Sequence, residues 1–174
     1  ADMPGNEGLT LPAQVNFVGK GGNLYDLGYE LNGSYVAIQK HLSLTYLWNR
    51  IRVQGGAYGG TFIFNASSGA SQFLSWQDPN IVGTLKNYDE AADYLKQVEL
   101  TDDELETTII GAIGSIESHD LPDAKGFKAT VRQMTGYSDE MRQQVRDDVL
   151  STTLDDFREM GDMLARLAEN AGVV

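Results

Sequence analysis

The 174-residue chain contains no cysteine and only two histidines. Without cysteine, neither a disulfide framework nor a cluster of thiolate metal ligands can form. The absence fits a reducing compartment, and chance absence from a chain this short explains it equally well. We therefore expect the cytoplasm or an organelle matrix rather than secretion.

Basic residues and long apolar runs are also scarce. Lysine and arginine number 13 against 25 aspartates and glutamates, which gives a net charge of −12. Nucleic-acid binding is not expected, because phosphate backbones are bound by basic patches that release counterions. A cationic partner is the better expectation. No apolar run approaches the roughly 20 residues that span a bilayer, and residues 1–6 lack the basic and apolar regions of an export signal, so we expect no membrane partner.

The length and composition suit one globular domain, with 41% hydrophobic and 22% charged residues. Residues 1–12, rich in glycine, proline and asparagine, are predicted to be a linker, and residues 13–174 a single domain. A strand is predicted over residues 14–18, stopped by the glycines of residues 19–22. Ser34 is expected to cap a long helix, whose apolar residues are spread widely enough to predict burial on more than one side: Tyr35, Ile38, Leu42, Leu44, Leu47, Trp48 and Ile51.

The rest of the chain reads as a hairpin followed by helices. Residues 61–65 and 71–77 form two runs in which polar and apolar residues alternate, the pattern of two antiparallel strands. The aspartate and proline at 78–79 are expected to start a helix, and Thr101 and Glu104 form a capping box that starts the next. Further helices are expected near residues 124–134, near residues 139–150, and after a cap at Thr152 or Thr153, the last one ending at a C-cap glycine, Gly172.

This order of elements predicts an α+β fold, with helices layered on one face of a mostly antiparallel sheet. Val173 and Val174 directly follow the predicted C-cap glycine. Their position is typical of the first step of a further strand, so the C-terminal strand is expected to be truncated.

The segment from Arg52 to Gly60 is the one most typical of a functional site. Four glycines surround Tyr58 between a helix and a strand, and glycines cost backbone entropy that folds accept mainly at unusual backbone angles or close approaches. From the residues alone, Arg52 also fits a solvated or salt-bridged helix end, and Tyr58 an aromatic plug beneath a turn. A phosphate loop is not expected, because such loops follow a strand and feed a helix.

Residues 51–59 resemble the Arg/Tyr signature in the last domain of the presequence-protease branch of the inverted-zincin (pitrilysin/insulinase superfamily) metallopeptidases. Further matches follow in the family's order at residues 14–23, 73–80, 121–127 and 150–153, and together they cover nearly the whole chain. On this resemblance the chain is identified as most of the fourth, C-terminal domain of such a peptidase.

The resemblance implies a zinc-dependent endopeptidase that degrades unstructured peptides, basic ones among them, inside a closed chamber. It implies that Arg52 and Tyr58 are catalytic residues that position the scissile peptide and stabilise the oxyanion, since a guanidinium and a phenol are preorganised donors. Gly55 and Gly56 are expected to contact substrate. Zinc would be bound by the N-terminal half of the same polypeptide, which is the expected partner.

This chain itself shows no zinc motif. The family signature H-x-x-E-H places two histidines on one helical face beside a glutamate, whereas His41 and His119 are far apart and lack that pattern. The acidic groups at residues 102–106 and 155–156 are expected at helix starts, where the dipole favours negative charge. The chain alone is therefore expected to bind no metal and to be inactive. The alternative function is a catalytically inactive structural or peptide-binding homologue.

Overall fold

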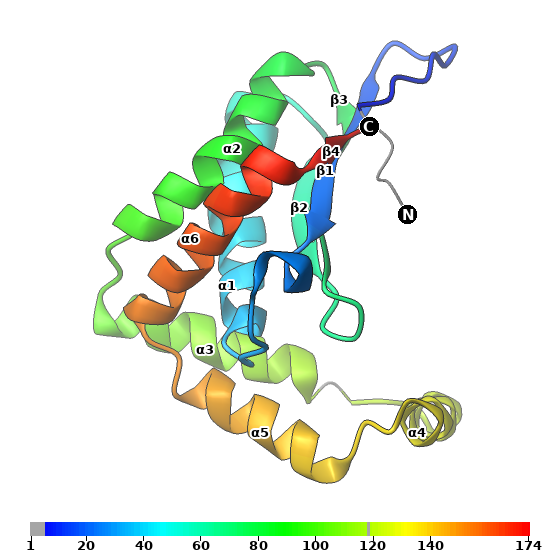
Figure 1. The fold of residues 1–174 in the computed structure, drawn as a ribbon, viewed down its shortest axis with the longest axis vertical. Coiled ribbons are helices and arrows are strands. Elements are labelled where there is room, and N and C mark those ends of the chain that lie inside the picture. The colour runs from blue at the N-terminus through cyan, green and yellow to red at the C-terminus, as the bar shows by residue number, and fades with distance from the viewer. Residues whose placement is uncertain (1–5, 118) are drawn as a thin grey trace.

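A computed structural model describes residues 6–117 and 119–174 of the chain. The sheet has four antiparallel strands in the order β2-β3-β1-β4. They are β1 (Asn16–Asn23), β2 (Gly59–Phe64), β3 (Ala70–Asp78) and β4 (Gly172–Val173). Figure 1 shows the helices α1, α2 and α6 on one side of this sheet, and the predicted α+β class is confirmed.

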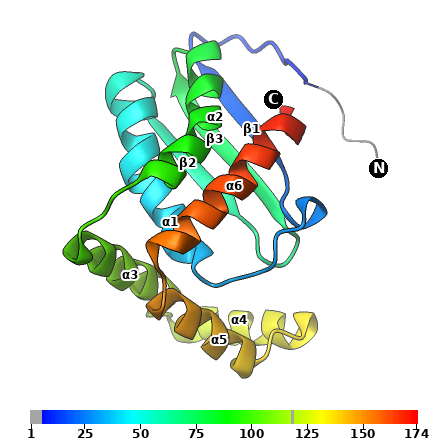
Figure 2. The same cartoon turned by 60° about the vertical axis from the view of Figure 1, so that its left-hand side comes forward.

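The helices follow the predicted order. They are the 3-10 turn η1 (Tyr25–Leu27), α1 (Tyr35–His41), the π-helix η2 (Leu42–Gln54), α2 (Val82–Gln97), α3 (Asp102–Ile116), α4 (Pro122–Thr135), α5 (Asp139–Leu150) and α6 (Leu154–Asn170). Helix α1 runs directly into η2, while α2 and α6 lie over the sheet and α3, α4 and α5 lie beyond the end of this layer (Figures 1 and 2). No helix among the described residues is long and apolar enough to cross a bilayer.

The N-terminal segment was predicted to be a linker as far as residue 12. Residues 1–5 of that segment lie outside the described residues, and residues 6–12 form no helix or strand. The backbone N–H of Glu7 donates to the carbonyl of Val173 at 2.9 Å, so this segment touches β4.

One hydrophobic core lies between the sheet and the helices. Its buried side chains come from both layers: Ile38, Leu42, Leu47, Ile51, Phe62, Phe73, Leu95, Phe157 and Met160. Ala37 on α1 joins a second, smaller cluster with Ala112 and Val149, so α1 is buried on two sides as predicted. The prediction is wrong for η2, because Leu44 and Trp48 on that helix are exposed.

Capping boxes start two helices, of which the sequence predicted the first as a box and the second only as a cap at Thr152 or Thr153. The Thr101 side chain accepts from the backbone N–H of Glu104, and the Glu104 carboxylate accepts from the backbone N–H of Thr101. Thr153 and Asp156 form the same arrangement at the start of α6. Both boxes depend only on residues three apart; this spacing predicted the Thr101 box, whereas Asp156 was not predicted as the partner of Thr153.

The expected cap at Ser34 is wrong. Its side chain makes no capping hydrogen bond, although Ser34 does occupy the position before α1. The amides of the two residues before α1 bind other side chains, since Asn32 Oδ1 accepts from Ser34 N and Asp148 Oδ2 accepts from Gly33 N, both at 2.9 Å. The first amides of α1 itself donate to the backbone carbonyls of Asn32 and Gly33. Asp148 comes from α5, a long-range partner that local spacing does not reveal.

Two predicted helix ends also differ. The helix expected at residues 78–79 begins at Val82, because Asp78 is the last residue of β3. At the end of α6 the C-cap is Ala171 in an extended conformation, so the predicted glycine C-cap is wrong. Gly172 lies in β4 and pairs with Gly21 of β1. Pairing with the sheet therefore sets the end of α6.

The glycines of residues 19–22 were expected to stop the first strand, and this is wrong, because β1 continues through them to Asn23. A Cβ added at Gly21 would lie 2.4 Å from the Ser71 carbonyl oxygen, and one added at Gly22 would lie 2.9 Å from Leu167 Cδ1. Glycine here serves close approach of β3 and α6 to β1, as glycines inside strands often do.

The outer edge of the β2–β3 hairpin is covered by side chains of the long helix. The backbone N–H of Phe62 donates to Ser43 Oγ at 3.1 Å, and that of Phe64 donates to Gln39 Oε1 at 2.7 Å. Unpaired amides on an edge strand invite pairing with another chain. At these two positions the edge is closed.

Gly21→Ala is expected to lower the free energy of unfolding of the 174-residue chain by about 1–3 kcal/mol, because the new methyl group overpacks the β1–β3 contact. Gly126→Ala in α4 is the matched control. A Cβ there meets nothing within 4 Å, so it should raise stability by up to about 1 kcal/mol through helix propensity. Urea denaturation of both variants measures this, and equal effects of the two substitutions would contradict the close-approach role of Gly21.

Candidate functional site

The glycine turn joins the end of η2 to the start of β2. The backbone N–H of Gly56 donates to the Arg52 carbonyl at 3.0 Å, and that of Ala57 donates to the Ile51 carbonyl at 3.1 Å. Of the four glycines around Tyr58, only Gly56 has a positive φ, at 79°. Gly59 is needed for a different reason, since a Cβ there would lie 2.3 Å from the Trp76 ring.

Buried residues fix both ends of this turn. Ile51 and Ala57 are both in the hydrophobic core, and each directly precedes one of the predicted catalytic residues. Burial of these two side chains leaves Arg52 half-buried and Tyr58 exposed, with 62% of Tyr58 accessible to solvent. The turn therefore presents both predicted side chains at the surface.

Arg52 and Tyr58 are brought together. Arg52 Nη1 donates to the Tyr58 carbonyl oxygen at 2.8 Å, and the guanidinium carbon lies 5.4 Å from the centroid of the Tyr58 ring. Among the described residues, no carboxylate forms an ion pair with Arg52. The salt-bridged helix end considered from the sequence is not what the structure shows.

Trp48 lies beside Arg52 and Tyr58, and it was not among the residues predicted from the sequence. The Arg52 guanidinium carbon lies 4.3 Å from the Trp48 ring centroid, within the range of a cation–π interaction. Trp48 was interpreted as a core residue of the long helix, but 45% of it is exposed. A tryptophan four residues before an arginine on one helix is the signal that could have indicated this contact.

The group can act as a pair of hydrogen-bond donors. The guanidinium is always charged; toward the residues that the structure describes it makes one hydrogen bond, to the Tyr58 carbonyl, which leaves further N–H groups as donors, and the phenol carries an O–H. Gly55 and Gly56, the predicted substrate contacts, form the turn between the two residues, with Gly55 half-buried and Gly56 exposed. The arrangement suits stabilisation of a negative charge that approaches from outside the domain.

His41 has a structural role in the core. It is 6% exposed, and its Nε2 lies 2.7 Å from the Tyr94 hydroxyl. Burial lowers the pKa of His41 below its ordinary 6.5, against a smaller opposing effect of Glu104. His119 is exposed. In residues 6–117 and 119–174, no cluster of three or more histidine, aspartate or glutamate side chains could hold a metal ion.

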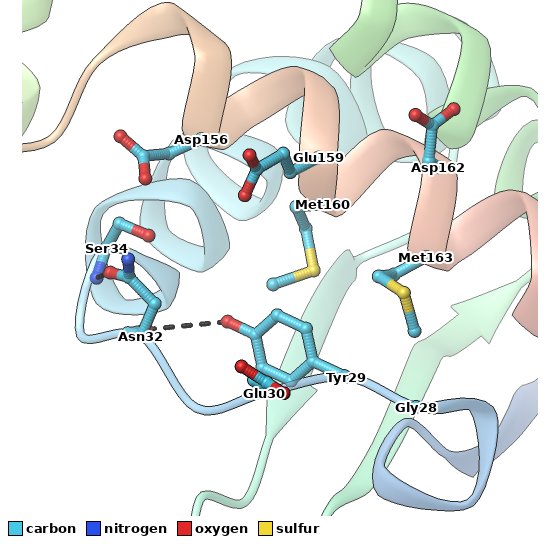
Figure 3. A pocket seen from close by; sticks show the side chains of 10 residues that line it. All are labelled: Gly28, Tyr29, Glu30, Asn32, Ser34, Asp156, Glu159, Met160, Asp162 and Met163. Atoms are coloured by element: carbon cyan, nitrogen blue, oxygen red, sulfur yellow. Dashed lines mark hydrogen bonds between the residues drawn. The ribbon is translucent and has the colours of Figure 1, made fainter.

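A pocket of about 280 Å³ lies at the opposite end of the α1–η2 helix from Arg52. Figure 3 shows Tyr29, Met160 and Met163 in its interior and carboxylates around it. Two of these acids already have local roles, since Asp156 belongs to the Thr153 capping box and Asp162 pairs with Lys96 at 3.2 Å. Neither Arg52 nor Tyr58 lines this pocket.

Comparison with known proteins finds one family and several relatives. Residues 6–174 match the family described as the PreP C-terminal domain. Presequence protease 1, chloroplastic/mitochondrial, from Arabidopsis thaliana is 46% identical over 159 residues, which are 91% of this chain and 15% of that protein. The chain therefore spans a small part of the length of this relative.

Solved structures share the fold at low sequence identity. A protease from Helicobacter pylori superposes with a TM-score of 0.68 at 15% identity, covering 93% of this chain and 41% of that one. A Bordetella parapertussis domain described as an inactive peptidase domain superposes with a TM-score of 0.64 at 15% identity, covering 95% of this chain and 92% of that one.

The buried His41 predicts a pH dependence of stability. The folded state binds a proton on His41 less readily than the unfolded chain does, so this histidine contributes stability above about pH 6.5 that is lost as the pH falls below its unfolded pKa. Between about pH 7.5 and 5.5, the free energy of unfolding should fall more steeply for the 174-residue chain than for its His41→Gln variant. Denaturant titrations at several pH values measure both slopes, and parallel curves would exclude the effect.

Proposed function

The chain belongs to the PreP C-terminal domain family and is the C-terminal domain of such a peptidase, and from this membership we propose how it takes part in peptide hydrolysis. In this proposal, Arg52 and Tyr58 are catalytic residues that act in trans on a zinc centre held by the N-terminal half of the same polypeptide. The described residues of this chain offer no cluster that could hold the zinc.

The chemistry follows from where charge develops. Attack on a peptide carbonyl builds negative charge on its oxygen, and donors already in place for that oxygen lower the barrier. The Tyr58 O–H and the Arg52 N–H groups would supply such donors, with Arg52 also orienting the scissile peptide. Gly55 and Gly56 would contact the substrate at the turn. At Gly56 an added Cβ would meet only Pro79 Cγ, at 3.6 Å, so the missing side chain leaves room for a substrate backbone, whereas at Gly55 it would face the Ile51 carbonyl oxygen at 2.6 Å.

The observation that supports this proposal most directly is the exposed pairing of Arg52 and Tyr58. Their contact through the Tyr58 carbonyl and their outward position fit donors that complete a site on another part of the polypeptide. Among the described residues no carboxylate neutralises Arg52, so its charge is available to a group outside the domain.

We propose unstructured peptides as the substrates, cleaved in a chamber between two halves of the enzyme. The net charge of −12 favours basic peptides among them. For the compartment, the Arabidopsis relative is named chloroplastic/mitochondrial, and the absence of cysteine fits an organelle matrix or the cytoplasm.

An inactive structural or peptide-binding homologue is the second candidate. The observation that favours it is the fold shared with a domain described as inactive, which means that this fold alone does not carry activity. The gene decides between the two: an H-x-x-E-H motif upstream of this domain indicates a peptidase, and its absence indicates a scaffold.

In the full-length peptidase, Tyr58→Phe and Arg52→Lys are each expected to lower kcat for an unstructured peptide by about 10²–10³, the usual cost of one lost oxyanion donor. Zinc content should stay unchanged, because neither residue would bind the metal. Steady-state kinetics and metal analysis provide the two measurements.

Tyr137→Phe, which removes the hydroxyl of a half-buried tyrosine between α4 and α5, is the matched control and should retain full turnover. An unimpaired kcat for Tyr58→Phe with zinc bound would refute the catalytic role of Tyr58.

A further inference from the structure

The end of β3 departs from regular strand geometry beside the Tyr58 turn. In the pairing of β1 with β3, Asn16 faces Asp78 and Val18 faces Ser75, so two residues of β3 stand opposite one residue of β1. The extra residue belongs to a β-bulge, and Gln77 there has a φ of 49°. Bulges are frequent next to active sites, where they re-aim the chain.

The bulge is tied directly to the turn. The Gln77 carbonyl accepts the backbone N–H of Tyr58 at 3.3 Å. A left-handed conformation is unfavourable for a residue with a side chain and persists only where its surroundings impose it. The residue that follows, Asp78, supplies those surroundings.

Asp78 is fully buried, with 0% of it exposed, and its carboxylate is saturated with hydrogen bonds. Oδ2 accepts from the hydroxyls of Ser75 and Thr84, each at 2.7 Å. Oδ1 accepts from the backbone N–H of Asn80 at 2.8 Å. A buried carboxylate is tolerated only with such partners, so this network fixes the position of Asn80 relative to the sheet.

Asn80 in turn reaches the glycine turn. Its Nδ2 donates to the Gly55 carbonyl oxygen at 2.7 Å, and Gly55 is the C-cap of η2. This carbonyl lies at a helix end, where the last carbonyls lack partners within the helix. The turn is thereby held from two sides, by Asn80 at Gly55 and by Gln77 at Tyr58.

We propose that Asn80 is a positioning residue for Tyr58: anchored by the buried carboxylate of Asp78, it clamps the Gly55 carbonyl and so fixes the turn that presents the phenol. This inference rests on the proposed catalytic role of Tyr58 and extends it to a residue that need not touch the substrate. Asn80 is exposed, so its replacement should leave the core and the Asp78 network in place.

The test is a double-mutant cycle in the full-length peptidase, with Asn80→Ala, Tyr58→Phe and the combination of the two. Asn80→Ala is expected to lower kcat roughly threefold to tenfold, the range for loss of one hydrogen bond, with little change in KM. In the Tyr58→Phe background, Asn80→Ala should have no further effect, because the group that it positions is gone.

Asn170→Ala is the matched control. Asn170 is also exposed and also donates through Nδ2 to a carbonyl near a helix end, that of Arg166 at 2.8 Å, but on α6. The two alanine variants should show the same small change in melting temperature, while only Asn80→Ala lowers kcat. A merely structural role for Asn80 would make the two variants alike in kcat.

Three outcomes would overturn the inference, and they differ from one another. Full activity of Asn80→Ala together with impaired activity of Tyr58→Phe would refute the positioning role of Asn80 and leave the proposed function unaffected. Equal factors of loss from Asn80→Ala in both backgrounds show that Asn80 does not act through Tyr58. Full activity of Tyr58→Phe would refute the catalytic role of Tyr58, and with it the positioning role of Asn80.

Discussion

The burial of Ile51 and Ala57 on either side of the glycine turn is the constraint on which the candidate site depends. Both side chains are in the core, and a hydrogen bond of 3.1 Å joins the Ala57 amide to the Ile51 carbonyl. Each of these residues is followed by one that points outward. The same burial that packs Ile51 and Ala57 into the core therefore also places Arg52 and Tyr58 at the surface. Close packing makes such an arrangement rigid, since interiors have little free volume.

Features that depend on neighbouring residues were predictable from the sequence, and features that depend on distant contacts were not. The capping box of Thr101 follows from local spacing alone, and the hairpin follows from alternation. The amide of Gly33, just before α1, instead donates to Asp148, a partner on another helix. The glycines of β1 looked like a strand end because their purpose, room for β3 and α6, is visible only once those elements are in place.

The residues of the candidate site were likewise predictable in part. The family resemblance selected Arg52 and Tyr58, and the structure brings them together. Trp48 was missed because an apolar residue on a helix is normally assigned to the core. Asp78 was taken for a helix cap, and its carboxylate does accept one backbone amide near α2. Its burial in a network of hydroxyls depends on Ser75 and Thr84, whose convergence needs the fold.

The covered edge of β2 limits how an extended polypeptide could be bound near Tyr58. Ser43 and Gln39 already occupy the amides of Phe62 and Phe64, so a peptide cannot add there as a fifth strand through main-chain pairing of the kind that many peptide-binding domains use. Selectivity between ligands at this edge of β2 would have to come from contacts with their side chains. For the same reason, a second copy of the chain cannot pair with these two amides of β2, so this part of the hairpin is protected from cross-β aggregation when the domain is on its own.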